Sequence, residues 1–226
     1  MKPKFAFNMR REIFDLCFDE ETAKGVNSLV EIEGDIADTN SAKDLKKNLS
    51  KADGCIAGWD PVMLTKEILD HAPNLKIVLF SGGSVKPLVS DEMWRRGIRV
   101  TSAAIVNAIP VAEFTLGMIL GSLKHVFRFH YEFKEKGSLA WRRPFTYDAI
   151  PGYYRSTVGI IGMGHIGRYL LKLLQPFDFN IVVCSRYFPD EHAERSKAKK
   201  VPLEELMSIS DVVTLHAADT PQNRHM

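Results

Sequence analysis

The chain has 226 residues, of which 45% are hydrophobic, so it can bury a core in one large or two modest domains. Its formal net charge of +2, from 30 basic and 28 acidic residues, gives no field strong enough to gather nucleic acid. No apolar run approaches the roughly 18 residues of a membrane span, and no hydrophobic leader follows the first residues, so the sequence predicts a soluble cytoplasmic protein with no membrane partner.

Strands and helices are expected to alternate over the first 103 residues. Short apolar runs predict strands at 5–8, 28–32, 54–59, 75–80 and 98–101, and helical spacing or capping residues predict helices at 13–25, 40–49, 65–71 and 90–96. Such alternation is typical of a parallel sheet covered on both faces. Residues 1–103 are therefore expected to form one α/β domain.

The loop at residues 81–85, Ser-Gly-Gly-Ser-Val, follows the fourth of these strands. Ligands of parallel sheets bind beyond the carboxyl ends of the strands, and the adjacent glycines Gly82 and Gly83 can present successive N–H groups to a small anion. A flexible turn is the alternative, and from the loop alone it is the favoured interpretation.

The longest helical pattern begins near Asn107 and extends to about residue 125, with Pro110 suited to its first turn. Its residues are apolar nearly all round, which predicts a helix buried within the protein or at a subunit interface. Residues 134–154 then turn irregular and rich in aromatic side chains. A loop of this length is usually functional or interfacial, so a dimerisation arm is expected.

Residues 157–174 predict a strand, a tight turn and a helix. The apolar run at 158–161 is typical of a strand buried on both faces, and helical spacing follows the turn Gly162-x-Gly164-x-x-Gly167. In this pattern the first glycine makes the turn, the second lets backbone approach a pyrophosphate, and the third lets the helix pack on the strand.

The phosphates of a dinucleotide would lie on the N–H groups of His165 and Ile166, where the helix dipole favours negative charge. A second buried strand at 180–184 closes a βαβ unit of the size expected for this pattern. The sequence therefore favours a dinucleotide site over a glycine-rich structural turn.

The remaining residues predict helices at 191–198 and 202–207 and a third strand at 211–215, which ends at His216. The basic cluster at 197–200 is expected to be a solvated helix end. A doubly wound dinucleotide fold needs about six strands, so residues 104–226 predict an incomplete Rossmann domain. The three cysteines, Cys17, Cys55 and Cys184, lack C-x-x-C spacing and predict buried free thiols in a reducing compartment.

Taken together, these segments resemble the D-isomer-specific 2-hydroxyacid dehydrogenase family, apparently truncated at the C-terminus. The resemblance rests on residues 72–76, 81–85, 96–101, 107, 111–113, 162–167, 210–216 and 220–221. It implies a flavodoxin-like substrate domain joined to a Rossmann domain, a nicotinamide cofactor, a small 2-hydroxy or 2-oxo acid substrate and a homodimer. It also implies that Gly82 and Gly83 hold the substrate carboxylate, with Asn107 near the substrate and the nicotinamide, which reverses the interpretation of that loop as a simple turn.

The sequence departs from the family pattern on the cofactor side. Ser185 and Arg186 stand where the family usually has an Asp that accepts the ribose 2′-OH, and a hydroxyl with a guanidinium would instead hold a 2′-phosphate. NADP is therefore slightly favoured over NAD, and a surface role for Arg186 is the alternative. By the resemblance, His216 matches a cofactor-side position, while Ala218 replaces the usual Pro and Asn223 replaces a Thr.

The family's catalytic residues are a His that protonates the forming alkoxide, a Glu that orients it and an Arg that binds the carboxylate. The resemblance places all three beyond Met226, and none of the seven histidines of the chain lies in a matching context. Two functions remain open: an oxidoreductase represented by part of its chain, or a catalytically inactive NAD(P)-binding or dimerisation module.

Overall fold

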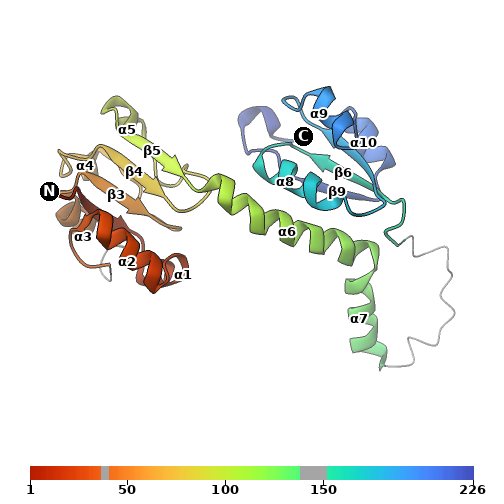
Figure 1. The fold of residues 1–226 in the computed structure, drawn as a ribbon, viewed down its shortest axis with the longest axis horizontal. Coiled ribbons are helices and arrows are strands. Elements are labelled where there is room, and N and C mark those ends of the chain that lie inside the picture. Colours follow the sequence, from red (N-terminus) through yellow and green to blue (C-terminus); the bar gives the residue numbers. More distant parts are fainter. Residues whose placement is uncertain (37–40, 138–151) are drawn as a thin grey trace. The chain divides into compact units, whose positions relative to one another are not determined.

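The computed structural model describes residues 1–36, 41–137 and 152–226, which form two compact units, Met1–Asn107 and Ala108–Met226. Each unit is built on its own parallel β-sheet (Figure 1). The division falls within the long helix α6 (Ala104–Leu123), a few residues after the boundary expected at residue 103.

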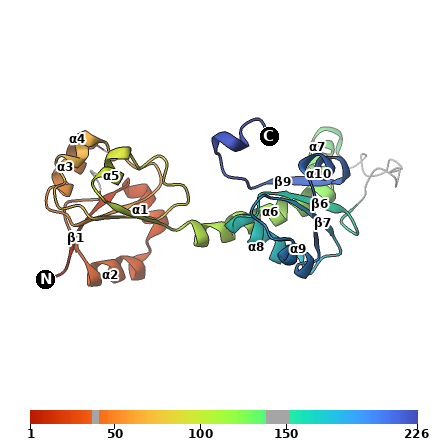
Figure 2. The same cartoon turned by 90° about the horizontal axis from the view of Figure 1, so that it is seen from above.

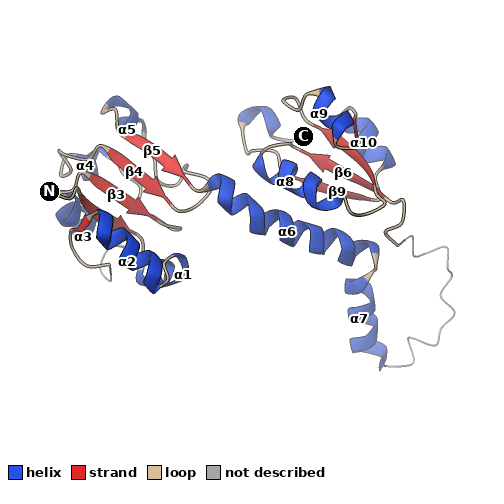
Figure 3. Cartoon of the chain, in the orientation of Figure 1, coloured by secondary structure: helices blue, strands red, loops and turns tan. Residues whose placement is uncertain are grey.

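The described residues of the first unit form five strands and five helices, with one or two helices between successive strands. In chain order they are β1 (Lys4–Asn8), α1 (Arg11–Cys17), α2 (Glu20–Leu29), β2 (Glu31–Ile32), α3 (Ala42–Leu49), β3 (Gly54–Ala57), α4 (Lys66–Leu69), β4 (Ile77–Phe80), α5 (Asp91–Arg95) and β5 (Arg99–Ser102). All strand pairs are parallel, in the order β2-β1-β3-β4-β5, and Figure 3 shows β3, β4 and β5 side by side. This is the flavodoxin-like order, which confirms the predicted fold and puts the switch point between β1 and β3.

Helices cover both faces of this sheet (Figure 2). Leu45 and Leu49 of α3 and Met93 of α5 are fully buried in one core, and Phe14 of α1 lies in the core on the other face. Burying each such side chain stabilises the fold by roughly 1.5–3 kcal/mol. The loops at the strand ends are therefore carried on a rigid platform.

Two expectations for the first unit are wrong. The single helix expected at 13–25 is two helices, because Asp19 caps α2 by accepting a hydrogen bond from the Thr22 N–H at 2.8 Å. That helix continues through Gly25 to Leu29, so the strand expected at 28–32 is only β2. Ser41 caps α3 as expected, whereas Asn40 lies outside the described residues.

The second unit contains most of α6 and the elements that follow it. These are α7 (Val126–Lys136), β6 (Thr157–Ile161), α8 (His165–Leu174), β7 (Asn180–Cys184), α9 (Asp190–Arg195), β8 (Ala198–Lys200), α10 (Leu203–Ile209), β9 (Val212–Leu215) and a 3-10 turn at Pro221–Asn223. The strands are parallel in the order β8-β7-β6-β9. This order equals the 3-2-1-4 portion of a Rossmann sheet, which confirms the predicted Rossmann fold.

The second sheet has one strand more than the sequence predicted. Ala198–Lys200 is strand β8, which pairs with β7, and is not a solvated helix end. Its two lysines are exposed while Ala198 is buried. A run with a single apolar residue does not show the hydrophobic pattern from which a strand is predicted. Side chains of α6, α8 and α9 pack in the core on one face of this sheet, and Leu206 of α10 packs in the core on the other.

Helix α6 differs from its prediction in three ways. It begins at Ala104, so Pro110 lies in its interior rather than its first turn and leaves the usual bond to the Val106 carbonyl unmade. Only Ala108, Ala112, Ile119 and Leu123 are buried and Phe114 is 68% exposed, so burial within the protein is wrong, whereas burial at a subunit interface stays a prediction. The helix is also long and apolar enough to cross a membrane, which corrects the statement that no apolar stretch has this length, although length and composition alone are weak evidence of a span.

The irregular segment expected at 134–154 is helical as far as Lys136, where α7 ends, and residues 138–151 lie outside the described part of the chain. All three cysteines are free, as predicted, but only Cys55 is fully buried. Burial raises the pKa of the Cys55 thiol to about 12, so this thiol stays protonated and unreactive.

Candidate functional site

The glycine loop between β6 and α8 is shaped by contacts at its first and third glycines. Gly162 has φ +92°, and a Cβ there would lie 2.4 Å from the backbone nitrogen of Ala217. A Cβ at Gly167 would lie 2.2 Å from the carbonyl oxygen of Gly162. Any side chain at either position would collide with backbone, so these two glycines are required by the fold itself.

Gly164 is in the opposite situation. It is the residue before α8, with φ −73° and ψ −157°, which other residues can also adopt, and a Cβ there would meet no atom within 4 Å. His165 beside it is exposed and Ile166 is half-buried. The first N–H groups of a helix have no acceptor within the helix, so the space in front of Gly164 faces free donors.

Two hydrogen bonds fix this loop between the ends of the neighbouring strands. The Gly162 N–H donates to the Cys184 carbonyl at 2.9 Å, and the His216 N–H donates to the Ile161 carbonyl at 2.7 Å. The loop therefore lies at the carboxyl edge of the sheet, at the switch point between β6 and β9, which is where open α/β sheets bind ligands.

Ser185 and Arg186 follow β7 at this same edge. Ser185 is half-buried and Arg186 is exposed. Within the part of the chain that the structure describes, neither side chain forms a hydrogen bond or an ion pair. The Ser185 hydroxyl and the Arg186 guanidinium are therefore available to a ligand at the edge of the sheet where the glycine loop lies.

His216 and Ala218 follow β9 on the other side of the loop. The His216 Nε2 lies 2.7 Å from the Thr214 hydroxyl oxygen, and burial lowers the pKa of this imidazole. Ala218 is exposed, and its carbonyl accepts a hydrogen bond from the Asn223 amide at 2.8 Å. The residue that replaces the family's Thr therefore ties down the turn after β9.

In the first unit, Gly82, Gly83 and Asn107 meet at the carboxyl edge of the sheet. A Cβ on Gly83 would lie 3.4 Å from the Asn107 amide nitrogen. Gly82 is buried, and a Cβ there would lie 2.7 Å from the Phe80 ring and 2.9 Å from the Trp59 indole nitrogen. The fold thus brings the loop and Asn107, which are distant in the sequence, together within one unit.

Two residues beside these loops were not singled out from the sequence. Trp59 covers Gly82, and Arg168 donates from Nε to the Met163 carbonyl at 3.0 Å. The position of Trp59 two residues after the end of β3 was the available signal, because that strand end lies at the ligand edge. In the described ranges no three His, Cys, Asp or Glu residues gather as a metal site would require.

Comparison with known proteins agrees with this geometry. Residues 116–226 match the family model "D-isomer specific 2-hydroxyacid dehydrogenase, NAD binding domain". Residues 116–226 therefore belong to the NAD-binding domain of the D-isomer specific 2-hydroxyacid dehydrogenase family. The matched range contains the glycine loop and the ends of β7 and β9.

Among curated relatives in this family, a D-3-phosphoglycerate dehydrogenase of Methanocaldococcus jannaschii is 28% identical over 92% of this chain and 38% of its own length. A glyoxylate reductase of Thermococcus gammatolerans is 33% identical over 71% of the chain and 48% of its own length. The chain thus spans less than half of these relatives. The crystal structure of the PH0520 protein from Pyrococcus horikoshii has a TM-score of 0.72 at 26% identity and covers all of this chain and 65% of that one.

Proposed function

We propose that the second unit is a dinucleotide-binding domain that holds NAD or NADP at the glycine loop. The pyrophosphate would lie on the N–H groups of His165 and Ile166, and His216 and Ala218 would line the cofactor side of the neighbouring strand end. The family match and the position of the loop at the switch point support this assignment.

One observation carries the proposal, and it concerns Gly164. Its backbone angles do not require glycine, and a side chain there would meet no protein atom within 4 Å. Packing therefore does not explain this glycine, whereas close approach of a phosphate to the backbone does. Gly162 and Gly167 alone would fit a purely structural turn.

We propose that the first unit is a substrate domain that binds a small 2-hydroxy or 2-oxo acid. The N–H groups at Gly82 and Gly83 would hold its carboxylate, with the Asn107 amide alongside. The whole protein would then be an oxidoreductase, in which the nicotinamide supplies or accepts the hydride. Because no residues of the 226 match the family's catalytic acid, its Glu or its Arg, we propose that this chain alone does not turn over.

The cofactor preference proposed here is for NADP over NAD. A contact between the Arg186 guanidinium and a 2′-phosphate contributes roughly 1.5–3 kcal/mol, or about ten- to a hundredfold in affinity. Titration calorimetry with NADPH and NADH tests this: Arg186→Ala should weaken NADPH binding and leave NADH binding nearly unchanged, and Ser185→Asp should reverse the preference. Equal NADPH affinity of wild type and Arg186→Ala would show that Arg186 does not bind the 2′-phosphate, and NAD would then be the proposed cofactor.

The second candidate function, a dimerisation module without chemistry, is favoured by the apolar surface of α6 and α7. Phe114 is 68% exposed and Tyr131 63% exposed. Phe127 and Met118, on the same two helices, are exposed as well. We propose that a second copy covers this surface in a homodimer, since Glu113 is exposed on α6 and a carboxylate is costly within lipid. Sedimentation should show a dimer in wild type and a shift to monomer in Phe114→Arg, and a monomeric wild type would contradict it.

The two functions are separated by turnover of a chain restored to full family length. Oxidation of NADPH with glyoxylate, hydroxypyruvate or pyruvate would establish the oxidoreductase. Cofactor binding and dimerisation without turnover on these or other 2-oxo acids would favour the module.

A further inference from the structure

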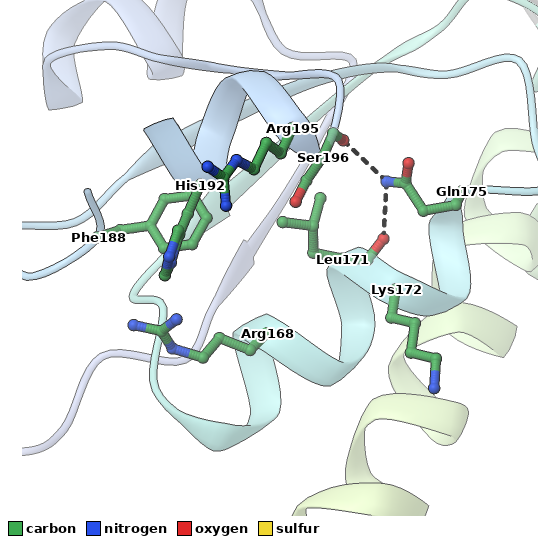
Figure 4. A pocket seen from close by; sticks show the side chains of 8 residues that line it. All are labelled: Arg168, Leu171, Lys172, Gln175, Phe188, His192, Arg195 and Ser196. Carbon is green, nitrogen blue, oxygen red and sulfur yellow. Dashed lines mark hydrogen bonds between the residues drawn. The ribbon is translucent and has the colours of Figure 1, made fainter. Parts of the chain in front are cut away.

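A hollow of about 370 Å³ lies between α8 and the segment that contains α9 (Figure 4). Arg168 lines it from α8 and Gln175 from the residue after that helix. On the other side His192 and Arg195 line it from α9, three residues apart on one helix face, and Phe188 lines it from the loop before α9. The hollow is thus a groove between two neighbouring helices of one unit.

The groove is positively charged. Arg168 and Arg195 carry fixed charges, and among the residues that line it in the described ranges there is no Asp or Glu. Asp190, the first residue of α9, is engaged with Lys200 at 3.0 Å. Arg195 takes part in no ion pair within the described part of the chain. The like charges around the groove therefore favour an anionic ligand.

The floor of the groove is apolar and aromatic. Phe188 is 3% exposed and Leu171 4% exposed, so both belong to the core while lining the hollow. The Arg168 guanidinium lies 5.3 Å from the centre of the Phe188 ring, and the His192 ring lies 6.1 Å from it. Figure 4 shows Arg168 and His192 next to this ring and Arg195 among the side chains that line the hollow. The Phe188 ring is itself covered by Arg168 and His192, whereas these two side chains are exposed, so a ligand with a planar ring would stack on the His192 ring or the Arg168 guanidinium.

Both ends of the groove are fixed before any ligand arrives. The Arg168 Nε donates to the Met163 carbonyl at 3.0 Å, which holds the guanidinium over Phe188. At the other end the Gln175 amide donates to the carbonyls of Leu171 and Ser196, each at 3.0 Å, and so ties α8 to the turn after α9. Such preorganisation lowers the entropy cost of binding.

The groove is separate from the dinucleotide site. None of the three loop glycines lines it, and neither Ser185 nor Arg186 does. We propose that the groove binds a small phosphate monoester that carries a planar ring, with the phosphate at the Arg168 and Arg195 guanidiniums and the ring against the exposed His192. This site is additional to the proposed cofactor and substrate sites and does not depend on them.

Calorimetry on the 226-residue chain with phenyl phosphate and with inorganic phosphate tests the proposal. Phenyl phosphate should bind more tightly than inorganic phosphate, and more weakly as salt rises. Arg195→Gln should weaken phenyl phosphate about tenfold, and Arg195→Lys should retain part of the affinity. His192→Ala should remove the advantage of phenyl phosphate over inorganic phosphate. Thermal melting of each variant checks that it is folded.

Arg186→Gln is the matched control, because it removes an exposed guanidinium of the same unit from the cofactor side. Any phosphate bound at the cofactor side would be lost in this variant, but Arg195→Gln should still weaken phenyl phosphate about tenfold in the Arg186→Gln background. Loss of binding in Arg186→Gln but not in Arg195→Gln would locate the phosphate at the dinucleotide site and overturn the proposal. No binding of phenyl phosphate by wild type at millimolar concentration, or equal binding by wild type and Arg195→Gln, would overturn it as well.

Discussion

The two glycine loops, residues 81–85 in the first unit and Gly162 to Gly167 in the second, lie at equivalent edges of their sheets but are constrained by different atoms. A side chain on Gly162 or Gly167 would meet backbone, which cannot move without displacing a strand end. A side chain on Gly82 would meet the Phe80 ring and the Trp59 indole, which can rotate. The loop of the second unit is therefore fixed by the main chain, and the loop of the first unit by side chains that can adjust.

The largest effect is expected from Gly162→Ala. The variant would combine a left-handed backbone angle with a Cβ 2.4 Å from the Ala217 nitrogen, so the free energy of unfolding should fall by about 3 kcal/mol. Urea denaturation of the variant and of wild type measures this difference. A loss below about 1 kcal/mol would show that the loop can shift and that the two loops do not differ as described.

A smaller effect is expected from Gly82→Ala, with Gly83→Ala as its matched neighbour. Alanine at 82 forces the rings of Phe80 and Trp59 to move and should cost about 1–2 kcal/mol, whereas alanine at 83 meets only the Asn107 amide at 3.4 Å and should cost less than about 1 kcal/mol. Denaturation of both variants under the same conditions makes the comparison. Equal costs at the two positions would contradict the packing of Gly82 under Trp59.

The smallest effect concerns His216 beside the second loop. Burial lowers its pKa from 6.5, so at acidic pH the unfolded chain binds a proton that the folded chain resists. The contribution to stability is therefore present above about pH 6.5 and is lost as the pH falls through the lower pKa of the folded state. Between pH 7.5 and 5, wild type should lose stability more steeply than His216→Gln. Parallel pH profiles for the two proteins would show that this imidazole is not desolvated.

Most of the correctly predicted helices and strands were predicted from patterns of residues that are close together in the sequence. The strand at 157–161 and the helix beginning at His165 were readable because buried apolar runs and three glycines occur within a few residues of one another. Strand β8 was not readable, because Ala198–Lys200 has one apolar residue and becomes a strand only by pairing with β7. The break between α1 and α2 depended on one capping carboxylate, that of Asp19.

The candidate site was partly readable for the same reason. The loops at Gly82 and Gly162 stood out as glycine clusters after strands, but the proximity of Asn107 to Gly83 depends on how β4 and β5 lie side by side. The open space in front of Gly164 likewise depends on the folded loop and cannot be predicted from the amino-acid sequence. The contacts that distinguish the two loops therefore arise from tertiary structure.

The central claim, that Gly164 is a glycine because a dinucleotide approaches it, is tested most directly by Gly164→Val. A valine there has room in the protein but would occupy the place of the pyrophosphate. Calorimetric titration with NADH and NADPH should show binding to wild type and at least about a tenfold loss in the variant, while the free energy of unfolding changes by no more than about 1 kcal/mol. Equal dissociation constants for wild type and Gly164→Val would contradict the account.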